Sequence, residues 1–267
     1  MRRSRLVAYV TSVLLGVVAT LTGATAAHAS EAAATGYVAL GDSYSSGVGA
    51  GGYISSSGDC KRSTKAYPYL WAAANSPSSF HFTACSGART DDVLAGQLAP
   101  LGTGTGLVSI SVGGNDAGFA DVMVTCVTQS DSACISRINT AKAYVDSTLP
   151  GKLDSVYRAI RSKAPSAHVV VLGYPRFYKL GTACLGLSET KRAAINQASD
   201  HLNTAIEKRA LNHGFTFGDV RSAFTGHEIC SGSSWLHSVN WLNIGESYHP
   251  TANGQSGGYL PVFRTAA

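Results

Sequence analysis

The chain has 267 residues, of which 45% are hydrophobic and only 14% are charged. Three of its 21 basic residues lie in the first five positions, so the rest of the chain nearly balances its 16 acidic residues, and this balance argues against nucleic-acid binding. The length suits one large domain with a substantial core better than two small domains.

The first segment of the chain has the pattern of an export signal. Arginines near the start precede an apolar stretch, and Ala27-His28-Ala29 has the small-x-small form of a signal-peptidase site. We therefore expect residues 1–29 to be a signal peptide and the mature protein, residues 30–267, to be a single secreted, extracellular domain. An uncleaved membrane anchor fits less well, because polar residues and glycines interrupt the apolar stretch. We expect no transmembrane segment in the mature chain.

Short apolar runs and helical patterns alternate along the first half of the mature chain. In chain order, the patterns predict a strand at 36–41, a helix at 67–75, a strand at 80–84, a helix from about Asp91 and a strand at 107–112. The stretch at 47–58 is rich in glycine and serine, so we expect a mobile loop there.

The second half continues this alternation. Residues 116–150 have helical spacing, and the patterns after them predict a helix at 153–163, a strand at 168–172, a helix at 189–212 and a strand at 215–220. Strands that alternate with helices in this way predict an α/β fold, in which helices cover both faces of a parallel sheet of about five strands.

Six cysteines are an even number in a chain that we expect to be exported, which favours disulfide bonds. The sequence does not choose among the many pairings, but we expect the sequential one: Cys60–Cys85, Cys126–Cys134 and Cys184–Cys230. A zinc site fits less well, because no two cysteines have the spacing of zinc ligands. We expect neither a metal nor a cofactor.

Ser43 is the first candidate catalytic residue. It follows the strand at 36–41 in the motif Gly41-Asp42-Ser43, where the glycine permits a tight turn and the aspartate can bind backbone N–H groups. A serine at the carboxyl end of a parallel strand lies where open α/β sheets bind their ligands. Gly-Asp-Ser alone is also a common turn sequence, and the GxSxG signature of α/β-hydrolase nucleophiles is absent from the chain.

Two further motifs follow predicted strands and contain groups that can bind an oxyanion. Asn115 stands in GGND, just after the strand at 107–112, and its amide can donate a hydrogen bond to a developing negative charge. Gly87 follows the strand at 80–84 and can offer its backbone N–H to the same oxygen. A capped turn at Asn115 and an ordinary turn glycine at Gly87 are the alternative interpretations.

His249 is the candidate general base for Ser43. Pro250 restricts its backbone, and Glu246, three residues earlier, is an acid within plausible reach of the ring. The imidazole must be neutral to accept the serine proton. We therefore expect activity to rise as the pH increases through about 6 to 7, unless the protein shifts the pKa of the ring.

Taken together and in this order, Gly-Asp-Ser near the mature N-terminus, the glycine after the second strand, GGND and the C-terminal ExxHP resemble the SGNH hydrolases, also called GDSL esterases and lipases. The six-cysteine spacing and the loop GYISSSGDCKRS are similar to those of secreted actinobacterial lipases and phospholipases in this family. The resemblance covers nearly the whole mature chain, from Tyr37 to about Gly254.

The resemblance implies a flavodoxin-like, three-layer α/β/α sandwich. It also implies a nucleophile, Ser43, a general base, His249, and an oxyanion hole formed by the N–H groups of Ser43 and Gly87 and by the side chain of Asn115. The family usually has an aspartate where this chain has Glu246. Some close relatives orient the histidine through a main-chain carbonyl, which here belongs to Glu246 or Ser247, and both arrangements stay open.

We therefore expect a secreted, metal-independent carboxylic ester hydrolase, a monomer that acts on acyl esters of lipids at a transient lipid–water interface through an acyl-serine intermediate. Triacylglycerols and long-chain esters are the first expectation, phospholipid acyl esters the second and carbohydrate acetates the third. The loop at 47–58 and the aromatic residues Tyr44, Tyr53, Phe119 and Tyr248 can line an acyl groove or be ordinary packing residues. A non-catalytic secreted lipid- or glycan-binding protein and a disulfide-rich structural surface protein are the alternatives from other classes.

Overall fold

The computed structural model describes residues 35–267. The expected signal peptide, residues 1–29, and the expected mature start at Ser30 therefore lie outside the described residues. Within residues 35–267, no helix combines the length and the apolar character that are needed to cross a membrane.

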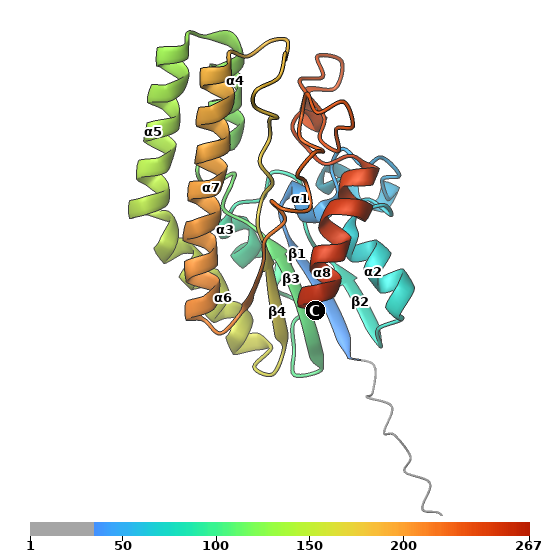
Figure 1. Cartoon of the computed structure of the whole chain (residues 1–267). Helices are drawn as coiled ribbons and strands as arrows, with labels where there is room; N and C mark the ends of the chain where they lie inside the picture. The colour runs from blue at the N-terminus through green and yellow to red at the C-terminus, as the bar shows by residue number, and fades with distance from the viewer. Residues whose placement is uncertain (1–34) are drawn as a thin grey trace, which may run out of the picture. The chain divides into compact units, whose positions relative to one another are not determined.

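A five-stranded parallel sheet forms the centre of the structure (Figure 1). Its strands are β1 (Gly36–Gly41), β2 (Ser79–Phe82), β3 (Thr105–Ser111), β4 (His168–Leu172) and β5 (Thr216–Gly218), in the spatial order β2-β1-β3-β4-β5. The valines and leucines of β1 and β4 are almost fully buried, as expected for a parallel sheet covered on both faces. Because all strands run in the same direction, their carboxyl ends lie at one edge of the sheet.

Helices cover both faces of this sheet, which confirms the predicted three-layer α/β/α fold (Figure 1). On one face, the ring of Tyr37 packs against Trp71 and Phe263, with ring centroids 5.0 and 5.6 Å apart. These two residues belong to α2 (Tyr67–Asn75) and α8 (Leu260–Ala266). The other helices are α1 (Ser43–Ser46), α3 (Thr90–Asp92), α4 (Phe119–Thr128), α5 (Asp131–Ser147), α6 (Leu149–Lys163) and α7 (Glu189–Asn212).

The predicted elements match the structure best where the local pattern is strong. The strands at 36–41 and 168–172 and the helices at 67–75 and 189–212 have the predicted bounds. Helix α7 shows why: the side chain of Ser188 caps its first turn by accepting a hydrogen bond from the Lys191 N–H, and Gly214 follows its end with φ +67°.

Other parts of the sequence prediction were wrong. The helix expected from Asp91 ends after three residues and continues as the π-helix η2 (Val93–Gln97). The π-helix η4 (Gly254–Tyr259) and α8 were not predicted, although Tyr259 and Phe263 are fully buried. The stretch at 47–58 is not an open loop throughout, because its first residues pack into the protein and its end begins the 3-10 helix η1 (Ser55–Cys60).

Three disulfide bonds join the cysteines in the sequential pairing. They connect Cys60 to Cys85, Cys126 to Cys134 and Cys184 to Cys230. The first links η1 to the segment after β2, two residues before Gly87, and the second links α4 to α5. The third fastens the segment before α7 to the segment after β5. Each bond therefore closes a connection outside the sheet.

Candidate active site

Ser43 begins the short helix α1 directly after β1, at the carboxyl edge of the sheet. Gly41 has φ +120°, and a Cβ added to it would lie only 2.4 Å from the carbonyl oxygen of Ser111, so only glycine fits this turn. The next residue, Asp42, caps the helix by accepting a hydrogen bond from the Tyr44 N–H at 3.0 Å. This turn fixes the position of Ser43, whose side chain is nearly buried.

His249 reaches Ser43 from a segment more than 200 residues later in the chain. The Nε2 atom of His249 lies 2.7 Å from the Ser43 Oγ atom. Two backbone hydrogen bonds to His237 hold the segment: the His237 N–H donates to the His249 carbonyl, and the Tyr248 N–H donates to the His237 carbonyl. The hydroxyl of Tyr44 also donates to the Tyr248 carbonyl at 2.7 Å, which ties this segment to α1.

A main-chain carbonyl faces the other ring nitrogen of His249. The Nδ1 atom lies 3.0 Å from the carbonyl oxygen of Ser247, whereas the side chain of Glu246 points elsewhere and accepts a hydrogen bond from the Tyr53 hydroxyl at 2.7 Å. A carbonyl can only accept, so Nδ1 carries the proton of the neutral ring and Nε2 presents its lone pair to the Ser43 hydroxyl. This tautomer is the one that a general base for Ser43 requires.

Burial lowers the pKa of His249 from 6.5 to about 4, because desolvation disfavours the charged imidazolium. The hydrogen bond to the Ser247 carbonyl opposes this effect, and the electrostatic effects of the neighbouring His237 and Lys61 side chains add to it. The sequence-based expectation that activity rises through about pH 6 to 7 assumed an unshifted pKa. With a pKa of about 4, the expected transition lies near pH 4 instead.

The two candidate oxyanion motifs lie together beside Ser43. Gly87 and Asn115 line the same groove as Ser43 and His249, and this groove has a volume of about 350 Å³. The Asn115 Nδ2 group donates a hydrogen bond to the Ala88 carbonyl at 3.0 Å, and the side chain of Asp116 accepts one from the Thr90 N–H. These bonds fasten the loop after β3 to the loop that contains Gly87.

Sequence reasoning missed a buried network behind Ser43. The carboxylate of Asp42 accepts hydrogen bonds from the hydroxyls of Ser111 and Tyr174, and the Tyr174 oxygen accepts one from the Gly114 N–H at 3.3 Å. Burial raises the pKa of Asp42 to about 6, although these hydroxyls favour the charged form. The network connects the Ser43 turn to the GGND loop. No local pattern marks Tyr174, because it comes from the loop after β4.

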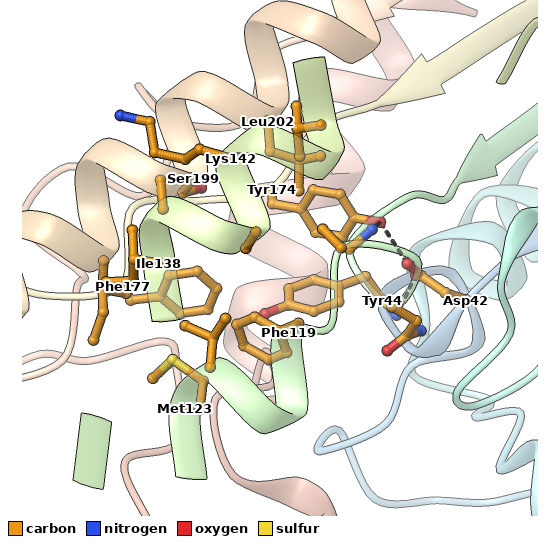
Figure 2. Close-up of a pocket in the computed structure, with 18 of the residues that line it drawn as sticks. Asp42, Tyr44, Phe119, Met123, Ile138, Lys142, Tyr174, Phe177, Ser199 and Leu202 are labelled. Atoms are coloured by element: carbon orange, nitrogen blue, oxygen red, sulfur yellow. Dashed lines mark hydrogen bonds between the residues drawn. The ribbon is translucent and has the colours of Figure 1, made fainter. Parts of the chain in front are cut away.

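A narrow apolar pocket of about 70 Å³, which Ser43 also lines, lies between α4, α5 and α7 (Figure 2). Its walls include Met123, Ile138, Phe177 and Leu202, and Tyr44 and Phe119 also line it. The aromatic residues proposed from the sequence therefore divide: Tyr44 and Phe119 line this pocket, Phe119 and Tyr248 line the groove, and Tyr53 lines neither.

Metal-binding side chains do not cluster in the part of the chain that the structure describes, since no three of its His, Cys, Asp or Glu residues are placed to hold an ion. The residues that do converge are a serine, a histidine, an amide and backbone N–H groups. A nucleophile, a base and oxyanion donors are the groups that nucleophilic catalysis of acyl transfer requires.

The chain is similar in sequence and in fold to known proteins. Residues 39–256 match the sequence pattern of the GDSL-like Lipase/Acylhydrolase family. The chain is 77% identical to Lipase 1 of Streptomyces coelicolor over 268 residues, which covers 100% of both chains. It is also similar to the crystal structure of a phospholipase A1 from Streptomyces albidoflavus NA297, with a TM-score of 0.87 and 69% identity over 88% of this chain and 100% of that one. A crystal structure of an extracellular lipase from Streptomyces rimosus has a TM-score of 0.86 and 66% identity over the same shares.

Proposed function

Because the chain belongs to the GDSL-like lipase/acylhydrolase family and is an ester hydrolase, we propose that it cleaves acyl esters of lipids through an acyl-Ser43 intermediate. The observation that carries this proposal is the 2.7 Å separation between Ser43 Oγ and His249 Nε2. At this distance a neutral imidazole can take the serine proton while Oγ attacks the carbonyl carbon of the ester.

In the proposed reaction, His249 moves one proton in each half. It accepts the Ser43 proton during attack and then gives this proton to the leaving alcohol as the tetrahedral intermediate collapses to the acyl-enzyme. A water molecule next attacks the acyl carbonyl and transfers a proton to His249, and the second collapse returns that proton to Ser43 and releases the fatty acid. The Ser247 carbonyl holds the ring in the required tautomer throughout and stabilises the imidazolium.

The proposed oxyanion hole consists of the Ser43 N–H, the Gly87 N–H and the Asn115 amide. Gly87 has φ +77°, and open space surrounds the position where a Cβ would stand, so its backbone is accessible from the groove. The Asn115 amide has two N–H donors, and the Ala88 carbonyl occupies only one of them. Removal of one oxyanion donor typically lowers turnover by about 10² to 10³.

The apolar pocket supports a lipid acyl chain as the part of the substrate that lies beside Ser43. Most of its lining surface is apolar (Figure 2), and Ser43 is among the residues that line it. Burial of each methylene contributes about 0.8 kcal/mol to binding, so this pocket favours acyl chains longer than acetate. Phospholipid acyl esters are the second candidate substrate, because a relative at 69% identity is a phospholipase A1.

Substitution of Ser43 and Asn115 tests the chemistry. Ser43→Ala should abolish hydrolysis of p-nitrophenyl butyrate and labelling by a fluorophosphonate, whereas Asn115→Ala should keep the labelling site and lose about 10² to 10³ in turnover. Near-normal hydrolysis by Ser43→Ala contradicts the proposed nucleophile. Failure of the parent chain to react with the fluorophosphonate supports a non-catalytic binding protein instead.

Substitution in the pocket tests the acyl chain. Ala198 lines the pocket on α7, and Ala198→Leu should lower kcat/KM for decanoyl esters about tenfold relative to acetyl esters by filling the space. Ala205, on the same helix, is partly buried but lies outside the pocket, so Ala205→Leu controls for crowding. An unchanged chain-length profile in Ala198→Leu contradicts the acyl pocket. Parallel assays with triacylglycerol and phosphatidylcholine emulsions decide between the two lipid classes.

We also propose that the protein is exported after cleavage behind Ala29 and acts outside the cell as a monomer. The signal-like pattern of residues 1–29 and the extracellular relative from Streptomyces rimosus support export. N-terminal sequencing of the protein from culture medium should begin at Ser30, and light scattering should give the mass of one chain. A chain retained in the membrane fraction with an intact N-terminus contradicts this proposal.

A further inference from the structure

Four large apolar side chains are exposed around the opening of the groove. Trp241, Leu242 and Ile244 lie on one loop with exposed fractions of 73%, 100% and 60%, and Val124 on α4 is 57% exposed. We call these four residues the apolar rim. Single exposed apolar residues are common on protein surfaces, but a group of them marks an interaction surface.

The apolar rim is continuous with the candidate active site. Val124, Trp241 and Ile244 line the groove that contains Ser43 and His249, and Leu242 directly follows Trp241 in the chain. No charged residue lies between Val239 and Gly245 in the sequence, although the Lys61 ammonium lies close to Gly245. Contact with an apolar phase would therefore remove water from this segment without burying an ion of its own.

The segment that carries most of the rim satisfies part of its own backbone, through the N–H groups of Leu242, Asn243, Glu246 and Ser247. The Asn240 Oδ1 atom accepts hydrogen bonds from the N–H groups of Leu242 and Asn243 at 3.1 and 3.2 Å. The Glu246 N–H donates to the Asn243 carbonyl, and the Ser247 N–H donates to the Ile244 carbonyl. An unpaired backbone N–H is costly in an apolar phase, so these bonds permit the loop to lose water around its tips.

We propose that the apolar rim docks the enzyme on the surface of a phospholipid bilayer, with the groove facing the lipid. This inference rests on the proposed lipid substrate, and it adds the surface by which the enzyme approaches that substrate. A second protein chain seated on the rim would cover the groove and exclude substrate from Ser43. A bilayer is the occupant that delivers an ester to the groove, because its phospholipids are themselves acyl esters, the second candidate substrate.

Vesicle binding by matched leucine variants tests the docking surface. Leu242 is fully exposed, so Leu242→Ser cannot disturb the core. The control is Leu211→Ser, because Leu211 is also exposed, at 58%, but lies at the end of α7, just before β5 begins. Both changes are made in a Ser43→Ala chain, so that phosphatidylcholine vesicles stay intact. Leu242→Ser should lower sedimentation with vesicles about tenfold or more, whereas Leu211→Ser should not change it.

Tryptophan fluorescence gives an independent readout. Trp71 and Trp235 are partly buried against the core, and Trp241 is the most exposed of the three tryptophans. Vesicles should therefore shift the emission to shorter wavelength in the parent chain, and Trp241→Phe should remove this shift. A shift that persists in Trp241→Phe, or equal sedimentation of Leu242→Ser and its parent, overturns the proposal.

Two further measurements separate failure of this inference from failure of the proposed function. With active Ser43, Leu242→Ser should hydrolyse dissolved p-nitrophenyl acetate within about twofold of the parent rate, because Leu242 does not line the groove, and it should lose rate on vesicles. A parent chain that hydrolyses no dissolved ester contradicts the proposed function, whatever its vesicle binding. A dimer that Leu242→Ser dissociates, with vesicle binding unchanged, identifies the rim as a contact between two copies and overturns the proposal.

Discussion

The exchange of Glu246 for glutamine should leave turnover almost unchanged. In the structure, the Glu246 carboxylate accepts a hydrogen bond from Tyr53, and the ring nitrogen that an acid would orient faces the Ser247 carbonyl at 3.0 Å. We therefore predict that kcat/KM of Glu246→Gln stays within about fivefold of the parent value, because the replaced group does not contact His249.

The magnitude follows from what the substitution removes. Glutamine keeps an oxygen that can accept the Tyr53 hydrogen bond, so the loss is one negative charge. Pairs of solvent-exposed charges contribute about 0 to 1 kcal/mol, and 1 kcal/mol corresponds to about fivefold in rate. An aspartate that does orient a catalytic histidine contributes about 10⁴ in turnover, as the serine-protease triad shows. The two mechanisms thus differ by about three orders of magnitude.

The assay is hydrolysis of dissolved p-nitrophenyl butyrate by the parent chain, Glu246→Gln and Tyr53→Phe over pH 4 to 8. Tyr53→Phe removes the hydrogen bond that Glu246→Gln keeps, and it serves as the control for a change in loop structure. The pH profile of Glu246→Gln should also coincide with that of the parent, because burial is the main cause of the lowered pKa of His249 and the Glu246 carboxylate does not contribute to it.

A fall of more than a hundredfold in Glu246→Gln, with Tyr53→Phe near normal and both variants folded, would refute the reasoning. It would show that the carboxylate turns toward His249 during the reaction and completes a side-chain triad. Equal large losses in both variants would instead assign the effect to the loop that Tyr53 and Glu246 hold together.

Three other predictions concern the pH response and the stability of the site. Since His249 must be neutral and its pKa is lowered to about 4, kcat/KM on a dissolved ester should rise through about pH 4 and be level from pH 6 to 8. A midpoint of this rise between about pH 6 and 7 would contradict the burial of the ring. Tyr174→Phe leaves an oxygen of buried Asp42 without its donor, so urea titration should show a loss of about 1 to 3 kcal/mol, and unchanged stability would rule out this role of the network. Replacement of Cys60 and Cys85 by serine opens a loop of 25 residues and should lower the free energy of unfolding, measured by urea titration, by about 3 kcal/mol. A loss below about 1 kcal/mol would contradict this prediction.

The sequence by itself determined the elements whose signals are local. The strand at 168–172 is an apolar run that ends at a glycine, and the helix at 189–212 has a capping serine before it and a glycine after it. The motifs at Ser43, Gly87 and Asn115 follow strands, and parallel strands bring their carboxyl ends to one edge, so their proximity could also be predicted. The sequence determines these features because each strand, helix end and motif is recognised from residues only a few positions apart.

Only the tertiary structure decided what depends on the direction of a side chain or on contacts between distant segments. The sequence left Glu246 and the main-chain carbonyls as equal candidates, because the spacing of residues does not reveal the turn at Tyr248, where φ is +65°. It likewise gave no sign that Tyr174 bonds to Asp42, which lies 132 positions earlier. The apolar pocket arises between three helices, and its width depends on how their side chains pack, which no single segment encodes.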